Sequence, residues 1–306
     1  MTLPTHNDAA RRAYWAEKME EAFAFMGHIR QYPVAECGEP VVGLVDAVAG
    51  AGVEVVFSER PHVQGLPRLF LLRAGLIDDF IRCARAMNER GWVMKVEDGF
   101  RTLTMQKFLA RAPYTFDVVL ERLLWECDGA QPPVELVMRR VAALVAAAPK
   151  VGTHMSGSAI DISVLDRASG REIERGRPYL ELSELTPMDS PFVSAEARAN
   201  RVAITELMAK HGFVTYPWEF WHYNKGDAYD HFLNQSGQAA RYGAVHVTLA
   251  DGSVEPIAEP LTPLNTYAEI EGEMQAALQR AAKNDDGMMG DSSHLIIPSS
   301  PPRRNR

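Results

Sequence analysis

One stretch decides how this chain folds: GTHMSGSAID, residues 152–161. His154 and Asp161 stand seven positions apart in it. On one straight helix, this spacing would separate the two side chains by about 10 Å along the axis. In one strand, the two side chains would lie on opposite faces. The chain must therefore turn between them, and Gly157, with small residues on both sides, permits such a turn.

The residues that follow the turn alternate in the manner of a strand, which we predict over 159–165. Asp161 and Ser163 would share one face, and the apolar Ile160 and Ile162 would share the other. A carboxylate at the start of a half-buried strand is unfavourable unless a positive group holds it. A divalent metal ion would be such a group.

A second stretch, EFWH at 219–222, adds one more carboxylate and one more imidazole. Glu219 and His222 would be neighbours on a helical turn but would face opposite ways in a strand, and the sequence leaves both conformations open. A catalytic zinc site keeps three protein ligands and one open position for water. We hypothesise that His154, Asp161 and His222 are the ligands, which leaves Glu219 free to move protons.

The combined pattern, His-x-x-Gly-x-Ala-x-Asp followed by Glu-x-Trp-His, resembles the zinc D-alanyl-D-alanine dipeptidases of vancomycin resistance and related DD-carboxypeptidases. The likeness extends from about Leu69 to Tyr223, which is roughly half of the chain. It implies an α+β fold with a central antiparallel sheet flanked by helices, as in hedgehog and DD-peptidase domains. It also implies one zinc ion per chain.

The resemblance further implies a role for each matching residue. It assigns His154, Asp161 and His222 to the metal ligands and Glu219 to the catalytic base. The run DGFR, which ends at Arg101, resembles a third family motif whose arginine contacts the substrate and the transition state. Arg101 is therefore expected to stabilise the oxyanion.

Three other positions bear on the comparison with this family. Gln106 stands where the family often has a glutamine. Gly152 replaces the serine that usually precedes the first histidine by two residues, and Thr102 replaces the proline that usually follows the arginine. These differences concern the substrate pocket more than the metal ligands.

The composition is typical of a globular protein, with 46% apolar and 24% charged residues among 306. The net charge of -8 does not favour binding to nucleic acids. No apolar run reaches the roughly 20 residues that span a bilayer, and the amino terminus lacks the pattern of a signal peptide. We therefore expect no nucleic-acid or membrane partner and a cytoplasmic location. The three cysteines do not suggest a disulfide framework.

The chain is predicted to have three parts: an N-terminal helix and pocket-wall segment (1–67), a catalytic domain with C-terminal helices (68–283), and a flexible tail (284–306). Helices are predicted over 8–30, 69–90, 104–110, 115–127, 134–148, 195–211, 230–242 and 266–283. Strands are predicted over 41–45, 53–57, 93–97, 159–165, 171–182 and 213–216, with a hairpin at 245–254. The first helix could pack on its own domain, clasp the core or form a homodimer contact.

Several other residues are candidates for lesser roles. Glu59, Arg60 and His62 could contact the substrate or lie on a solvated loop, and Trp221 is expected to pack beside the ligands and keep the site dry. His231 and His246 can bind metals but lack a matching motif.

The expected reaction is metal-assisted hydrolysis of a small peptide, with a D-Ala-D-Ala-type dipeptide as the first candidate. Two alternatives remain open. The same site could act on a small amide unrelated to peptidoglycan, or on a specialised metabolite. The chain could also be a non-catalytic zinc-binding module, although such a module would not need Glu219 and Arg101.

Overall fold

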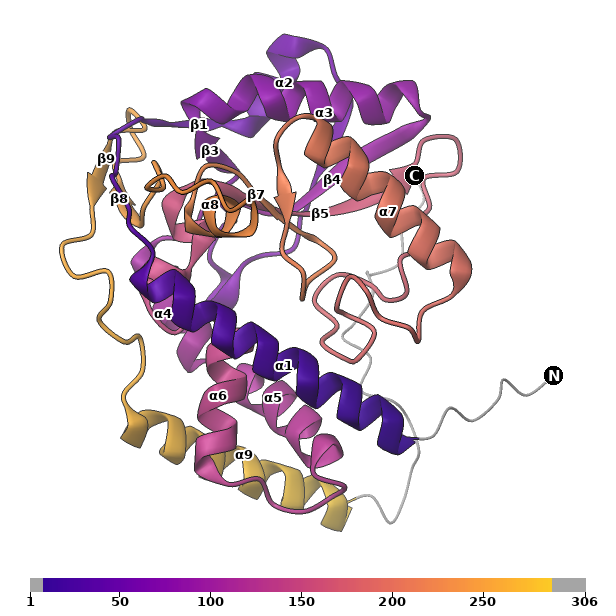
Figure 1. The fold of residues 1–306 in the computed structure, drawn as a ribbon, viewed down its shortest axis with the longest axis vertical. Coiled ribbons are helices and arrows are strands. Elements are labelled where there is room, and N and C mark those ends of the chain that lie inside the picture. Colours follow the sequence, from indigo (N-terminus) through magenta and orange to yellow (C-terminus); the bar gives the residue numbers. More distant parts are fainter. Residues whose placement is uncertain (1–7, 288–306) are drawn as a thin grey trace, which may run out of the picture.

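The computed structural model describes residues 8–287, which form a mixed five-stranded sheet between two groups of helices (Figure 1). The helices are α1 (Asp8–Gln31), α2 (Leu44–Ala51), α3 (Ile77–Glu89), α4 (Leu103–Arg111), α5 (Pro113–Glu126), α6 (Val134–Leu144), α7 (Ala195–Lys210), α8 (Ala228–Leu233) and α9 (Tyr267–Gly287). The strands are β1 (Val41–Gly43), β2 (Val55–Phe57), β3 (Leu71–Arg73), β4 (Trp92–Asp98), β5 (Ala159–Asp166), β6 (Val214–Thr215), β7 (His222–Asn224), β8 (Val245–Val247) and β9 (Val254–Pro256). Short 3-10 turns occupy Val63–Gly65, Ala74–Leu76, Pro149–Val151 and Thr153–Ser156.

The central sheet has the strand order β2-β4-β5-β7-β6. The pairs β4–β5, β5–β7 and β6–β7 are antiparallel, as expected, but β2 runs parallel to β4. A parallel pair requires a crossover connection, and α3 lies between these two strands in the chain. The predicted α+β class is confirmed, and the sheet is mixed because of this single crossover.

The main hydrophobic core covers one face of the sheet. Ile160, Ile162 and Val164 of β5 point into this core together with the residues opposite them on β4. The helices α3 and α7 supply its other wall, through Phe80, Met87, Ile204 and Met208. Because side chains alternate along a strand, Asp161 and Ser163 lie on the opposite face of β5. The core thus directs the carboxylate of Asp161 towards the other side of the sheet.

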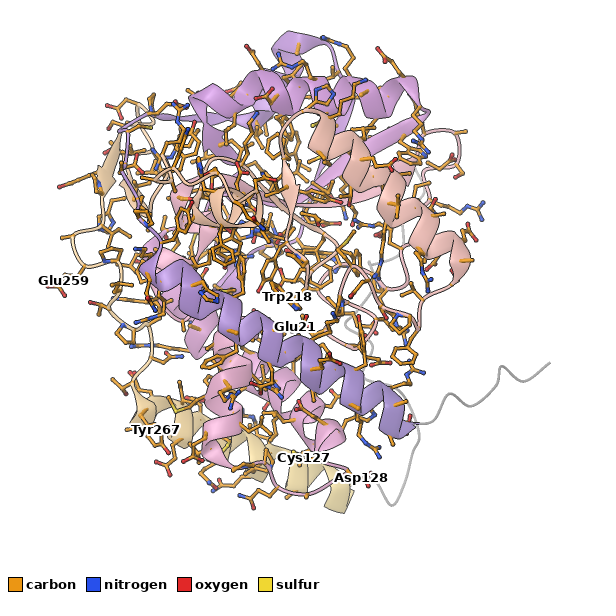
Figure 2. All side chains as sticks on the ribbon, in the orientation of Figure 1. Glu21, Cys127, Asp128, Trp218, Glu259 and Tyr267 are labelled. Carbon is orange, nitrogen blue, oxygen red and sulfur yellow. The ribbon has the colours of Figure 1, made fainter. Side chains whose placement is uncertain are left out.

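A second group of helices lies on the other side of the molecule, where α1 packs on α6, and α5 packs on α9 (Figure 1). The first helix is thus packed on its own chain. In the last third of α1, Phe25 contacts Tyr216, Trp218 and Tyr229, with the Phe25 and Trp218 ring centroids 5.2 Å apart. Trp218 is labelled beside α1 in Figure 2. This aromatic cluster joins α1 to the segment that carries Glu219.

Three predicted elements are wrong in extent. The segment 69–90 is not one helix, because β3 pairs with β1 and α3 begins only at Ile77. The strand predicted over 171–182 is reduced to one bridge between Leu165 and Glu172. The helix predicted over 230–242 ends at Leu233, since Gln235 and Gly237 then adopt positive φ.

The strand predicted over 41–45 ends at Gly43, because the helix α2, which was not predicted, begins at Leu44. The remaining predicted elements correspond to observed ones within a few residues, including the β8–β9 hairpin and the helix capped by Ser194. The predicted tail at 284–306 lies outside the described residues from position 288 onward. Within residues 8–287, no helix is long and apolar enough to cross a membrane.

Candidate metal centre

The pairing of three strands brings the first set of polar side chains together. Asp161 on β5 lies directly opposite His222 on β7 and directly opposite Asp98 on β4, where the register shifts by a bulge. Directly opposed residues of antiparallel strands project from the same face of the sheet. The three side chains therefore meet on the face that points away from the main core.

The predicted turn brings in His154. The 3-10 turn Thr153–Ser156 ends at Gly157, whose φ of 69° lies in the left-handed region. A side chain there would be strained, and a Cβ atom would also lie 3.1 Å from the Val41 Cγ1 atom. The glycine lets the chain reverse directly into β5, so that His154 returns over Asp161.

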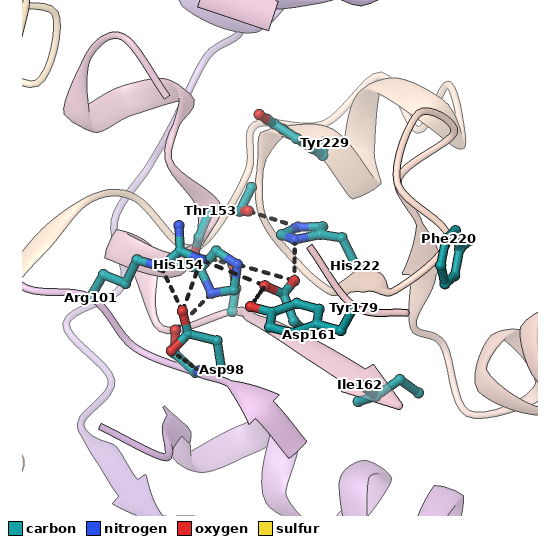
Figure 3. Close-up of polar contacts among 12 residues, drawn as sticks. Asp98, Arg101, Thr153, His154, Asp161, Ile162, Tyr179, Phe220, His222 and Tyr229 are labelled. Atoms are coloured by element: carbon teal, nitrogen blue, oxygen red, sulfur yellow. Dashed lines mark hydrogen bonds and ion pairs between the residues drawn. The ribbon is translucent and has the colours of Figure 1, made fainter. Parts of the chain in front are cut away.

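The three predicted ligands meet in one buried cluster (Figure 3). The Nδ1 atom of His222 lies 3.0 Å from Oδ1 of Asp161, and the Nε2 atom of His154 lies 3.3 Å from the same oxygen. The potential ligand atoms all lie within 4.8 Å of one another. One carboxylate oxygen thus faces one nitrogen from each imidazole.

The other nitrogen of each imidazole is engaged by the protein. Nδ1 of His154 lies 2.7 Å from the carbonyl oxygen of Gly99, which can only accept, so this nitrogen carries the proton. Nε2 of His222 lies 2.9 Å from Oγ1 of Thr153, which can accept a hydrogen bond from it. Metal-binding histidines are usually oriented by a hydrogen bond of this kind. Two imidazoles and one carboxylate arranged in this way fit the ligand chemistry of zinc.

Arg101 lies beside this cluster and is held by Asp98. Its Nε and Nη2 atoms are each 2.8 Å from Oδ2 of Asp98, and Nη2 is 3.5 Å from Oδ2 of Asp161. Burial by itself would lower the pKa of Arg101, but the charges of Asp98 and Asp161 outweigh this effect and raise it. The guanidinium is therefore a fixed positive charge at the edge of the cluster.

Glu219 lies in the connection between β6 and β7. The backbone N–H of His222 donates to the carbonyl oxygen of Glu219 at 3.2 Å, so the two residues share a turn rather than an extended strand. This answers the question that the sequence left open. The pKa of Glu219 is raised to about 7, chiefly by burial, with the charge of Asp161 adding to the rise and His222 and Arg101 opposing it.

The other candidates divide into those near the cluster and those away from it. Nε2 of His62 lies 3.6 Å from Asp98, whereas the side chains of Glu59 and Arg60 are exposed. Trp221 is buried, and its ring contacts that of Tyr179. Gln106 is buried on α4, and neither its amide nitrogen nor its amide oxygen has a hydrogen-bond partner within residues 8–287.

His231 and His246 do not belong to the metal cluster. His231 instead contacts the hydroxyl of Ser236, and His246 is exposed on β8. The absence of a motif around these two histidines was therefore informative.

Sequence reasoning missed three residues around the site. Thr153 contacts His222 as described, and Arg68 lies 3.0 Å from Asp98, just before the region of family likeness. Tyr179 donates its hydroxyl to Oδ2 of Asp161 at 2.9 Å. Thr153 adjoins a predicted ligand and could have been found, whereas no pattern marks Tyr179.

Two known proteins are similar to this chain over most of their length. A curated D-alanyl-D-alanine dipeptidase from Synechocystis sp. (strain ATCC 27184 / PCC 6803 / Kazusa) is 26% identical over 229 residues, which are 64% of this chain and 85% of that protein. A solved structure of the LdcB LD-carboxypeptidase is 18% identical, with a TM-score of 0.35, over 69% of this chain and 80% of that one.

The family model described as D-ala-D-ala dipeptidase matches residues 83–241, which are just over half of the chain and include every residue of the metal cluster. The resemblance seen in the sequence is thereby confirmed. This protein belongs to the Peptidase M15 family.

Proposed function

We propose that this peptidase is zinc-dependent and hydrolyses a small peptide, with a D-Ala-D-Ala-type dipeptide as the first candidate. The observation that carries this proposal is the convergence of His154 Nε2 and His222 Nδ1 on one oxygen of Asp161. Three protein ligands of this kind leave one zinc position for water or substrate. The name of the Synechocystis relative supports the choice of substrate.

Bound zinc would supply a Lewis acid that polarises the scissile carbonyl and acidifies water. We assign the proton transfers to Glu219. Burial raises the pKa of its carboxyl group to about 7, which suits a group that exchanges protons near neutral pH. It accepts a proton from the attacking water and donates one to the departing amine.

We assign stabilisation of the oxyanion to Arg101. Its guanidinium is already oriented by Asp98, so little reorganisation is needed when negative charge develops on the carbonyl oxygen. The buried surroundings strengthen this interaction, because fewer water molecules screen the charges.

A panel of three substrates tests the proposal. The purified protein is incubated with zinc and D-Ala-D-Ala, L-Ala-L-Ala or an N-acylated D-Ala-D-Ala, and released alanine is quantified by chromatography. Turnover of free D-Ala-D-Ala is the expected result. Cleavage of only the N-acylated peptide would mean a carboxypeptidase. Inactivity on all three would reject the peptide substrate and favour another small amide or a non-catalytic zinc module.

Variants test the individual roles. Glu219→Gln should retain zinc and lose about 10²–10⁴-fold in kcat, because only the proton-transfer group is changed. His154→Ala should lose the metal as well. Glu196→Gln is the matched control, since Glu196 is exposed on α7. Full activity of Glu219→Gln would show that another group is the base.

A further inference from the structure

The loop between β5 and α7 has firmly held ends. Arg175 is buried and donates from Nη2 to the carbonyl oxygen of Ile162 at 2.9 Å. Arg201 is also buried and donates to the carbonyl oxygens of Arg175, Leu185 and Pro187 at 2.6–2.7 Å. These bonds fasten both sides of the loop to the sheet and to α7.

The tip of the loop is built differently. The side chains of Arg177 and Leu180 are 47% and 51% exposed, whereas Tyr179 between them turns inward towards Asp161. Leu180 has a φ of 68°, in the left-handed region that leucine rarely adopts. Strain of this kind persists only where the surroundings enforce it. The exposed side chain of Leu180 gains little from it, so we attribute the conformation to the inward position of Tyr179.

The inward side chain contacts Asp161 of the metal cluster (Figure 3) and also contacts Trp221. The hydroxyl of Tyr179 donates to Oδ2 of Asp161 at 2.9 Å. Its ring packs edge-on against Trp221, with centroids 5.6 Å apart and an interplanar angle of 85°. The bond to Oδ2 leaves Oδ1 facing the two imidazoles. Tyr179 therefore sits where it can set the rotation of the carboxylate.

Control of that rotation matters because the last torsion of an aspartate is soft. Nη2 of Arg101 lies only 3.5 Å from the same Oδ2 that accepts from Tyr179. Without the hydroxyl, the carboxylate of Asp161 could rotate towards this guanidinium. That rotation would turn Oδ1 away from the imidazoles, and it would also draw Arg101 away from Asp98. The hydrogen bond from Tyr179 thus maintains the orientation of both Asp161 and Arg101.

We propose that Tyr179 is a positioning residue of the metal centre, whose hydroxyl orients Asp161 while its ring closes the site over Trp221. This role rests on the proposed zinc site and assigns a loop residue to it. It predicts that zinc binding, and not only turnover, depends on the hydroxyl of Tyr179. This residue lies outside the strands and turns that carry the ligands.

The test is the zinc affinity of the metal-free protein, measured by competition with a chromophoric chelator. Tyr179→Phe keeps the ring and removes only the hydroxyl. Loss of a group that orients a metal ligand typically weakens binding 10- to 100-fold, and we expect a loss in this range. Tyr114→Phe is the matched control, because Tyr114 is 53% exposed on α5, and its affinity should equal that of the unmodified protein.

A thermal melt of the metal-free Tyr179→Phe protein first establishes that it is folded. If the unmodified protein binds zinc and the zinc Kd of Tyr179→Phe is within twofold of its Kd, the positioning role is wrong and the proposed function stands. If the unmodified protein binds no zinc, both fail. A loss of affinity in Tyr179→Phe that Tyr114→Phe does not share supports the role assigned to the hydroxyl.

Discussion

Arg73 on β3 offers the most direct test of how the metal-site turn is held in place. Its side chain is fully buried, and its Nη1 and Nη2 atoms each lie 3.0 Å from the carboxylate of Glu36. It also donates to the carbonyl oxygens of Ser156, Glu39 and Gly243 at 2.5, 2.7 and 3.2 Å. One guanidinium therefore joins the segment after α1, the turn that carries His154, and the segment before β8.

Arg73→Met should destabilise the protein by about 3–5 kcal/mol, the usual result of removing one partner of a buried ion pair. Glu36 would keep only the backbone N–H groups of Gly38 and Gly243, at 2.9 and 2.6 Å, and its side chain is 10% exposed. Methionine fills much of the vacated volume, so most of the loss is electrostatic. The loss is measured as the shift in the urea midpoint multiplied by the slope of the unfolding transition.

Two further variants make this prediction refutable. Arg85→Met is the control, because Arg85 is exposed and makes one 3.3 Å bond to Ala51, and it should change stability by less than about 0.5 kcal/mol. Combining Arg73→Met with Glu36→Leu should recover part of the loss, since no buried charge is then left unpaired. A loss below about 1 kcal/mol in Arg73→Met, or no recovery in the double variant, would contradict the reasoning.

Three more predictions address pH, backbone strain and metal binding. Burial alone would raise the pKa of Asp79, but hydrogen bonds from Lys225 and Arg82 hold it below 3.8. Asp79→Asn should therefore reduce the free energy of unfolding in urea by about 0.5–1 kcal/mol at pH 7. The unmodified protein loses this advantage as pH falls below about 3.9 and through the still lower pKa of Asp79 in the folded protein, so the difference in stability between the two proteins should shrink with acidification below that pH. Gly157→Ala should reduce the free energy of unfolding by about 1 kcal/mol more than Gly170→Ala, as measured by thermal melts. Both glycines have a φ of 69°, but only a Cβ atom at position 157 would meet a side chain, at 3.1 Å. Equal losses of stability would mean that this contact relaxes. Zinc at 100 times its Kd should stabilise the unmodified protein by about 2.7 kcal/mol and raise its melting temperature, whereas the melting temperature of His154→Ala should not respond.

The metal cluster was predictable because its residue types and spacings satisfy several local rules at once. A turn was needed between His154 and Asp161, Gly157 permitted it, and the alternation after it placed Asp161 opposite the apolar face. The structure brings these residues together with His222 as the sequence suggested. The inferences about His154 and Asp161 used neighbours within one short segment, where sequence patterns are most informative. His222 was added from a second stretch, through the ligand chemistry of zinc and the resemblance to the family motif.

Extents and directions of other elements depended on partners that are distant in the sequence. The apolar spacing at Leu72, Leu76 and Phe80 fits one continuous helix, yet Leu72 lies on β3 because β1 is available to pair with it. The direction of β2 relative to β4 is likewise set by the crossover through α3. Periodicity describes which side of an element is buried and carries little information about what it pairs with.

The residues that orient the predicted metal ligands form the least predictable part of the site, for a chemical reason. Two of the contacts that hold the site and its loop end on backbone carbonyl oxygens: His154 on Gly99, and Arg175 on Ile162. Every residue type offers such a carbonyl, so no motif records the pairing. Tyr179 reaches its aspartate only because two buried arginines fix the ends of its loop. The ligands are thus marked by residue type, whereas their orientation depends on long-range backbone contacts, and variants in this loop should alter metal binding without touching a ligand.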